Sequence, residues 1–266
     1  MGKTTDAYSC WTRTVIVLRS TVFQVVFYLV TVIFSIASLP LFLLPPRAMV
    51  ELARAWGALN IWLLRVICGV RLEQRGRENI PAGAFLVASK HQSAWETFAL
   101  MSLFDFPTYV LKRELTWIPV FGWSLLKAGM IPLERSAGRD ALAGLIERVR
   151  RALAAGRQVI IFPEGTRRPV GAAPDYKLGV VQIYAASGAS CLPVALNSGL
   201  FWPRRSFLRY PGTLVVEYLP PIPPGLQRAA FFRRLQHDIE TATARLVAES
   251  ARSSTAAADT PHLERL

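Results

Sequence analysis

The feature that most constrains this chain is an uncharged apolar stretch near its start. From Ser20 to Leu44 the sequence contains no charged residue and is rich in Val, Ile, Leu and Phe. This stretch is longer than the roughly 20 residues that an α-helix needs to cross a bilayer. A signal peptide fits less well, because the apolar run is too long and no small-residue cleavage site follows it. We therefore predict a membrane-embedded helix here rather than a helix buried in a soluble core.

A second helix is predicted after Pro45 and Pro46, which cannot continue the first one. It runs from about Arg47 to Cys68 and combines an apolar stripe that contains Trp with three arginines. A helix of this composition either lies along the headgroups of a membrane or packs on the rest of the protein, and the sequence leaves both open. Residues 1–68 are thus expected to form a membrane-embedded or interfacial helical segment.

The charge of the chain indicates an anionic partner. The formal net charge is +13, from 31 Lys and Arg against 18 Asp and Glu, and 52% of the residues are hydrophobic. Nucleic acid, an anionic lipid surface or a phosphorylated substrate would each suit such a charge. The apolar N-terminus favours lipid, and arginines that are spread among apolar segments argue against nucleic acid. The three cysteines form no Cys-x-x-Cys pair and no metal spacing with the three histidines, so we expect neither a disulfide framework nor a zinc site.

Strand-like and helix-like segments alternate in the next part of the chain, residues 69–250. Seven short apolar runs have the length of strands: Val70–Gln74, Phe85–Ala88, Thr108–Leu111, Met130–Leu133, Val159–Phe162, Leu192–Leu196 and Thr213–Tyr218. Asp140–Ala155 is the clearest amphipathic helix, and further helices are expected over Leu178–Ala186 and Leu226–Ser250. This alternation predicts an α/β domain with a mostly parallel sheet flanked by helices. The tail, residues 251–266, has few large apolar residues and is expected to be disordered.

Polar residues follow the second of these strands where it ends. The run Phe85–Ala88 leads into Ser-Lys-His91-Gln-Ser-Ala-Trp-Glu96, and a new apolar segment follows. Residues five apart lie about 140° apart around a helix axis, so His91 and Glu96 can meet only if His91 lies in the loop and Glu96 in the first helical turn. Ser93 would then be the N-cap. The same residues also form a capping box, in which Glu96 would only bond the backbone.

A second polar cluster, Phe-Pro-Glu-Gly-Thr-Arg at residues 162–167, follows another predicted buried strand. Ligands of α/β sheets gather at the carboxyl ends of strands, which is where this cluster would lie. Gly165 permits close approach of the backbone, and the planar guanidinium group of Arg167 suits a phosphate. Lys112 ends one predicted strand and Arg135 shortly follows another, so both could join the same rim.

These stretches together resemble the glycerolipid acyltransferase family that includes lysophosphatidic acid acyltransferase. Four motifs of that family occur in order: His91-x4-Glu96, Lys112-x-Glu114-Leu115 with Pro119, Gly122 and Arg135, Phe162–Arg167, and the Pro-centred strand Leu192–Val194. The third motif is complete and is the most specific match. The first departs from the family, which usually has Asp where this chain has Glu96. The resemblance covers about residues 85–200.

The resemblance implies an enzyme that moves a fatty acyl chain from an acyl thioester to the free hydroxyl of lysophosphatidic acid, giving phosphatidic acid in phospholipid biosynthesis. In such a reaction His91 would take the proton of the alcohol, and Glu96 would orient the imidazole ring and stabilise its charged form. The backbone amides of Glu164, Gly165 and Thr166 are candidates to bind the developing oxyanion.

By the same resemblance, Lys112 and Arg167 would bind the acceptor phosphate, with Arg135 as a further candidate. A thiolate leaves readily, so no metal, bound cofactor or covalent enzyme intermediate is required, and the co-substrate would be acyl-CoA or acyl-acyl carrier protein. The expected partners are the lipid bilayer and the lysophospholipid acceptor. The expected location is the membrane, at the cytoplasmic face of a bacterial inner membrane.

Two other functions remain compatible with the sequence. The same scaffold could use glycerol-3-phosphate, another lysophospholipid or a lyso-aminolipid as acceptor, and the motifs do not distinguish these. A non-enzymatic membrane adaptor could also use its basic face to hold anionic lipid, but it leaves His91 and residues 162–167 unexplained.

Overall fold

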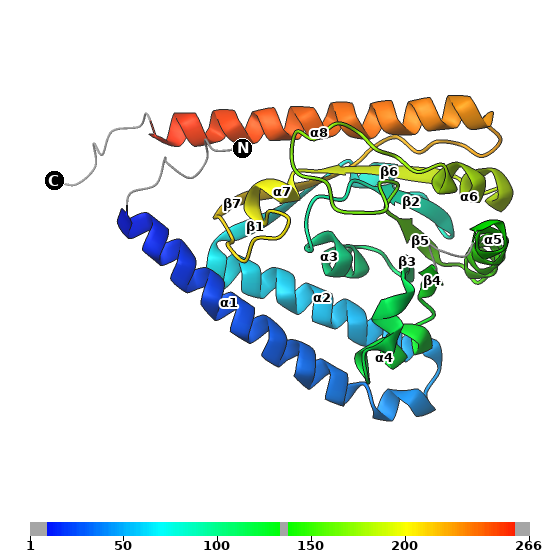
Figure 1. Cartoon of the computed structure of the whole chain (residues 1–266), viewed down its shortest axis with the longest axis horizontal. Helices are drawn as coiled ribbons and strands as arrows, with labels where there is room; N and C mark the ends of the chain where they lie inside the picture. Colours follow the sequence, from blue (N-terminus) through cyan, green and yellow to red (C-terminus); the bar gives the residue numbers. More distant parts are fainter. Residues whose placement is uncertain (1–9, 134–137, 259–266) are drawn as a thin grey trace.

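The computed structural model describes residues 10–133 and 138–258 and is built around a seven-stranded sheet (Figure 1). The strands are β1 (Val70–Arg75), β2 (Phe85–Ser89), β3 (Pro107–Lys112), β4 (Ile131–Leu133), β5 (Gln158–Ile161), β6 (Cys191–Leu196) and β7 (Gly212–Tyr218). Their order across the sheet is β1-β7-β6-β2-β5-β3-β4. Neighbours run parallel except β6 and β7, which are antiparallel. The predicted mostly parallel sheet is confirmed.

The position of β2 in the sheet decides where its polar continuation lies. β2 and β5 are buried along their whole length, as expected for parallel strands that are covered on both faces. β2 pairs with β5 through Val87 and Ile160, and with β6 through Ser89 and Val194. The carboxyl ends of β2, β5 and β6 therefore lie side by side at one edge of the sheet.

Helices cover both faces of the sheet. Their bounds are α1 (Cys10–Ala37), α2 (Pro46–Cys68), α3 (Glu96–Leu103), α4 (Phe121–Lys127), α5 (Gly138–Ala154), α6 (Gly179–Ser187), α7 (Ser198–Phe201) and α8 (Arg228–Ala258). Three 3-10 helices are η1 (Pro40–Leu43), η2 (Arg77–Asn79) and η3 (Arg113–Trp117). In Figure 1, α8 runs along one face, whereas α1, α2 and α3 lie on the other.

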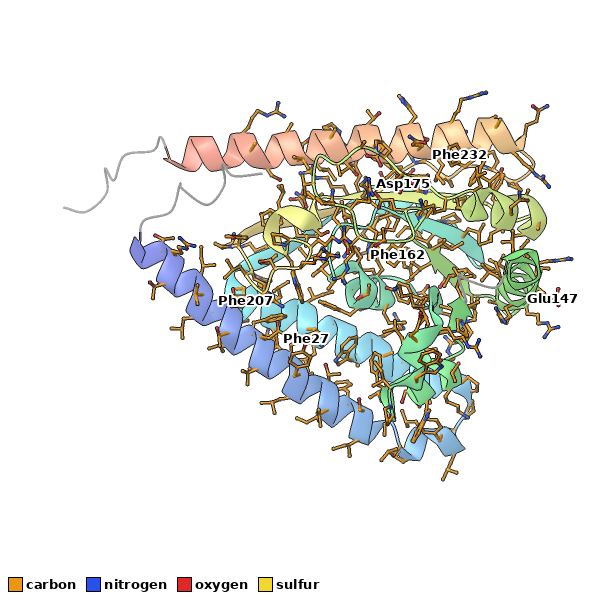
Figure 2. The ribbon with its side chains drawn as sticks, in the orientation of Figure 1. Phe27, Glu147, Phe162, Asp175, Phe207 and Phe232 are labelled. Carbon is orange, nitrogen blue, oxygen red and sulfur yellow. The ribbon has the colours of Figure 1, made fainter. Side chains whose placement is uncertain are left out.

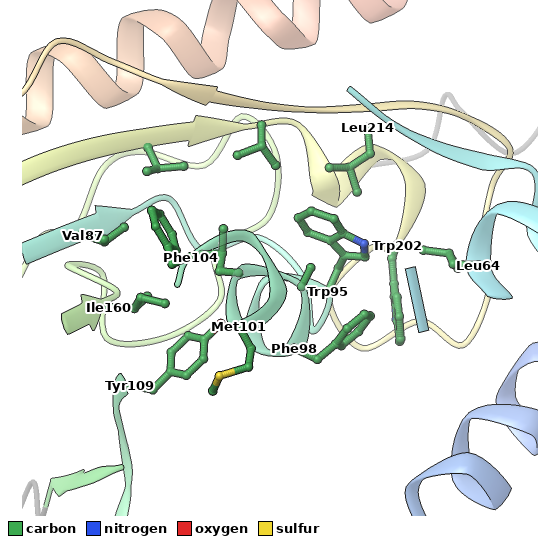
Figure 3. Packing of buried hydrophobic residues seen from close by; sticks show 14 of the residues in the cluster. Leu64, Val87, Trp95, Phe98, Met101, Phe104, Tyr109, Ile160, Trp202 and Leu214 are labelled. Carbon is green, nitrogen blue, oxygen red and sulfur yellow. The ribbon is translucent and has the colours of Figure 1, made fainter. Parts of the chain in front are cut away.

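Each face has its own hydrophobic core. On the α2 and α3 side, Trp95, Phe98 and Trp202 form an aromatic cluster (Figure 3), in which the rings of Phe98 and Trp202 lie 6.0 Å apart. On the opposite side, the ring of Tyr184 on α6 stacks on that of Phe231 on α8 at 3.7 Å. The two cores hold the sheet rigidly between helices, so the ends of the strands are fixed relative to one another.

The N-terminal segment consists of two packed helices. Trp56 of α2 donates a hydrogen bond to Thr31 of α1 at 3.3 Å, and α2 in turn packs on α3. At Gly57 a Cβ atom would lie 2.6 Å from the carbonyl oxygen of Phe98, so only glycine allows this close approach. The other face of α1 is apolar and exposed, and Thr12–Leu43 is long and apolar enough to cross a membrane.

The prediction of a disordered tail from residue 251 is wrong for its first part, because α8 continues to Ala258. Composition indicated disorder because large apolar residues are missing there. A helix that is already formed extends at little cost, however, and residues 256–258 are alanines, the best helix formers. Residues 259–266 lie outside the described residues.

Candidate active site

His91 lies in the loop between β2 and α3, as the spacing argument required. Its ring is buried and stacks on the ring of Phe162, with centroids 4.0 Å apart. The stacking partner, Phe162, directly follows β5 and lies near the middle of the molecule in Figure 2. The backbone of His91 is held on both sides: its N–H donates to Glu164 Oε2 at 2.8 Å, and its carbonyl accepts from the N–H of Arg168 at 2.8 Å. The two polar clusters predicted from the sequence are therefore one site.

Glu96 is the first residue of α3, and its buried carboxylate faces His91. The distance from His91 Nδ1 to Glu96 Oε2 is 3.5 Å, which is longer than a good hydrogen bond, and Nδ1 has no hydrogen-bond partner among the described residues. The same carboxylate accepts from the backbone N–H of Ser93 at 3.0 Å and of Gln92 at 3.2 Å. Glu96 thus bonds the backbone as a cap does and also lies beside His91.

The expectation that Ser93 is the N-cap is wrong in one respect, because the N-cap position of α3 is Trp95. Ser93 Oγ accepts a hydrogen bond from the N–H of Trp95 at 3.1 Å instead of from that of Glu96. Only half of the capping box is therefore present, namely the hydrogen bond that the backbone N–H of Ser93 donates to the Glu96 carboxylate. The bonds of the Glu96 carboxylate to Gln92, Ser93 and Ser198 hold Glu96 at the first position of α3, which accounts for the shift.

Residues 162–167 form a tight turn after β5. Gly165 has a φ of 62°, which favours glycine, and its N–H donates to the carbonyl of Phe162 at 2.9 Å. That amide is therefore already bonded and is a poorer oxyanion donor than expected. The side chain of Thr166 is exposed, and Arg167 is half-buried. Both residues line the cavity that His91 faces.

Glu164 lines the cavity and also forms hydrogen bonds in the interior of the protein. Its fully buried carboxylate bonds Lys90 Nζ at 2.7 Å and the N–H of His91. Lys90 is itself 3% exposed and also bonds Glu240 of α8 at 2.6 Å. Burial raises the pKa of the Glu164 carboxyl, and the Lys90 ammonium opposes that shift. Glu164, predicted to contribute its backbone amide to substrate binding, therefore also has a structural role, because its carboxylate positions His91.

The predicted phosphate ligands lie around one large cavity. Lys112 at the end of β3 and Arg167 line a space of about 1670 Å³ together with His91. Neither cation makes a hydrogen bond or ion pair with another described residue. Four other cationic residues, Lys177, Arg204, Arg205 and Arg209, line the same cavity. Much of the remaining wall is apolar and is supplied by α1, α2, α3 and α4, for example by Phe27, Trp56 and Leu125. Arg135, the third predicted cation, lies outside the described residues.

One residue of the site was missed by the sequence argument. Ser198, which follows β6 and is fully buried, donates a hydrogen bond to Glu96 Oε1. Its neighbour Gly199 donates its N–H to the side chain of Gln92 at 3.1 Å. The only signal for Ser198 was its place after the Pro-centred strand, which becomes informative once β6 is known to lie beside β2.

The chain is similar to known acyltransferases over the part that contains this site. The family described as Acyltransferase matches residues 71–197. A 1-acyl-sn-glycerol-3-phosphate acyltransferase from Pseudomonas aeruginosa is 42% identical over 179 residues, which cover 67% of this chain and 70% of that protein. A protein of the same name from Limnanthes alba is 33% identical over 62% of this chain, but the match spans only 58% of that relative.

The fold is also found in a solved structure. The crystal structure of the 1-acyl-sn-glycerophosphate (LPA) acyltransferase from Thermotoga maritima matches with a TM-score of 0.73, over 87% of this chain and 97% of that one. At 22% identity this match shows the shared fold alone. The family match and the 42% identity to the Pseudomonas protein lead to one conclusion: the chain belongs to the acyltransferase family that includes the 1-acyl-sn-glycerol-3-phosphate acyltransferases.

Proposed function

We propose that this acyltransferase transfers a fatty acyl chain from an acyl thioester to the free hydroxyl of lysophosphatidic acid, which gives phosphatidic acid. The observation that carries the proposal is that one cavity is lined by His91 and by Lys112 and Arg167, whose side chains have no ionic partner among the described residues. A base in the same cavity as cations that can bind a phosphate suits an acceptor that carries both a hydroxyl and a phosphate. The names of the relatives agree with this acceptor.

In the proposed reaction, His91 acts as the general base through Nε2. Its other nitrogen, Nδ1, faces the carboxylate of Glu96, which favours the tautomer with the proton on Nδ1. As the acceptor oxygen bonds to the thioester carbonyl carbon, its proton passes to Nε2. The C–S bond then breaks, and the imidazolium returns that proton to the leaving sulfur. The 3.5 Å separation between Nδ1 and Glu96 would shorten with substrate bound, as catalytic hydrogen bonds commonly do.

The acceptor would be fixed at its phosphate end. A guanidinium group binds a phosphate with two parallel hydrogen bonds, and an ammonium group adds a point charge. Arg167 and Lys112 would together orient the glycerol hydroxyl toward His91, which converts an encounter between two molecules into a reaction within one complex. The acyl chains would occupy the apolar part of the cavity. The donor we propose is acyl-CoA or acyl-acyl carrier protein.

The proposed location is the membrane. Within α1, Ser20 contacts the domain, because its hydroxyl accepts from the N–H of Arg209 at 2.8 Å. Just beyond its end, Ser38 and Ser124 of α4 share a hydrogen bond of 2.8 Å. A helix that is bonded to the domain at Ser20 and again just past its C-terminal end is better placed to lie along one face of a bilayer than to cross it. Two free buried thiols, Cys68 and Cys191, suit the reducing cytoplasmic face of a bacterial inner membrane.

An acceptor panel tests the proposal. The purified protein is given radiolabelled acyl-CoA with lysophosphatidic acid, glycerol-3-phosphate, a lysophospholipid with a larger headgroup, or a lyso-aminolipid. We expect lysophosphatidic acid to be used at least about tenfold faster than the others, because two cations contact a terminal phosphate. Faster acylation of another acceptor would overturn the substrate assignment, and transfer to none of them would overturn the activity.

A further inference from the structure

The catalytic domain carries exposed apolar side chains of its own, in a segment outside the N-terminal helices. This segment is η3–α4, residues 113–127, which joins β3 to β4. Trp117 is 67% exposed and Trp123 52%, and Ile118 and Leu126 are exposed beside them. In the rest of the described chain, large apolar side chains are exposed only within residues 17–66 and at two isolated positions. Several exposed large apolar side chains within one short segment are unusual on a soluble protein, and this patch indicates a contact surface.

This patch lies beside the turn between α1 and α2. Figure 1 shows α4 beside that turn, and the 2.8 Å hydrogen bond between Ser38 and Ser124 joins the two. Leu43 of η1, in the same turn, is 91% exposed. The segment η3–α4 is itself tightly packed: at Gly122 a Cβ atom would lie 2.4 Å from the carbonyl oxygen of Thr116. The exposed tryptophans are therefore held on a defined platform next to the apolar face of α1.

The inner side of the same segment forms part of the cavity wall. Val120, Phe121 and Leu125 line the cavity that contains His91, whereas Trp117 and Trp123 do not. Residues 113–127 thus separate the cavity from the medium that contacts the patch. A surface that contacts Trp117 and Trp123 would therefore be separated from the cavity by this one segment.

We propose that η3–α4 is a second membrane-contacting element, and that it forms the entrance through which a lipid acceptor passes from the bilayer into the cavity. The bilayer is favoured over a second copy of this chain because α4 is bonded to the turn between α1 and α2, next to a helix that is long and apolar enough for a membrane. The composition of η3–α4 agrees, since two tryptophans flanked by Arg113 and Lys127 are typical of the membrane interface.

The first test measures binding to vesicles and needs no substrate. The double variant Trp117→Ser/Trp123→Ser leaves the cavity wall unchanged, and Leu178→Ser is its control, because Leu178 is also 67% exposed but lies at the start of α6. With vesicles of phosphatidylethanolamine and phosphatidylglycerol, sedimentation should show a partition coefficient about tenfold lower for the double variant. The control should bind like the wild type, and the unfolding temperatures of all three proteins should agree. An unchanged partition coefficient in the double variant would overturn the proposal.

The second test addresses the entrance and rests on the proposed function. The double variant should acylate long-chain lysophosphatidic acid embedded in vesicles several-fold more slowly, yet use a short-chain, monomeric lysophosphatidic acid as well as the wild type does. An equal loss with both acceptors would refute the entrance. If the wild type acylates neither acceptor, the proposed function fails while the vesicle binding still decides the membrane contact. The proposal would also be overturned if the wild type sediments as a dimer while the double variant is a monomer that binds vesicles as well as the wild type does. That result would assign the patch to self-association.

Discussion

The hydrogen bond between Ser198 and Glu96 gives the sharpest prediction about the site. Ser198→Ala removes only the hydroxyl that donates to Glu96 Oε1. The carboxylate keeps its bonds to the amides of Gln92 and Ser93, so it stays in place but loses the contact that fixes its orientation. Because its other oxygen lies 3.5 Å from His91 Nδ1, a small rotation is enough to weaken that interaction. Ser198 therefore acts on the reaction through Glu96 and is a positioning residue.

The magnitude follows from the kind of bond that is lost. A hydrogen bond to a charged group contributes about 1.5–3 kcal/mol, and part of that loss will be expressed in the transition state. With about 1.4 kcal/mol per factor of ten in rate, kcat should fall roughly tenfold, whereas KM for lysophosphatidic acid should change little. The loss of stability should remain small, with an unfolding temperature lowered by about 2–4 °C per kcal/mol.

A double-mutant cycle separates this mechanism from a general loss of packing. Glu96→Asp shortens the side chain by one methylene, about 1.5 Å, so its carboxylate can no longer reach Ser198, the amides and His91 together. In that background Ser198→Ala should lower kcat less than about threefold, because the contact is already absent. The assay is steady-state kinetics with acyl-CoA and lysophosphatidic acid. A tenfold loss in both backgrounds, or a normal kcat for Ser198→Ala alone, would refute the reasoning.

Three further predictions address other parts of the site and the fold. Glu96→Gln keeps the amide bonds but not the charge, so kcat should fall about a hundredfold or more, and near-normal turnover would make Glu96 only a cap. Lys112→Ala and Arg167→Ala should each raise KM for lysophosphatidic acid about tenfold while sparing an acceptor without phosphate, and equal effects on both acceptors would count against phosphate binding. The hydrogen bond from Arg75 holds the pKa of the Glu249 carboxyl below its ordinary value. The ionised carboxylate therefore stabilises the folded protein at neutral pH, and this contribution is lost as the pH falls through the lowered pKa. In acid titrations of the unfolding temperature, Glu249→Gln should therefore lose less stability than the wild type, and parallel curves would contradict this.

The strands were predictable because each is a short apolar run between polar or glycine-containing segments. All seven lie within one residue of the predicted bounds at either end, from Val70–Arg75 to Gly212–Tyr218. The meeting of His91 with residues 162–167 was also predictable, since the carboxyl ends of neighbouring parallel strands lie at one edge of a sheet.

What the sequence did not show depends on the order of the strands and on packing between distant helices. Ser198 contacts Glu96 only because β6 lies next to β2, and no local pattern sets that order. The link from Lys90 to Glu240 likewise requires that α8 cross the sheet above the His91 loop. The N-cap at Trp95 reflects the tertiary bonds of Glu96, which outweigh the local capping preference of Ser93. These contacts join residues that are far apart in the chain, so no local sequence pattern indicates them.

The measurement that most directly tests the central assignment is the initial rate of phosphatidic acid formation by His91→Ala, compared with the wild type in the same vesicles. Loss of a general base lowers a rate by about 10²–10⁴-fold. We expect a loss in that range with unchanged vesicle binding. The unfolding temperature should fall only slightly, because the ring is lost from its stack on Phe162 but the His91 backbone keeps its bonds to Glu164 and Arg168. A folded, membrane-bound His91→Ala protein that still forms phosphatidic acid within tenfold of the wild-type rate would contradict the account.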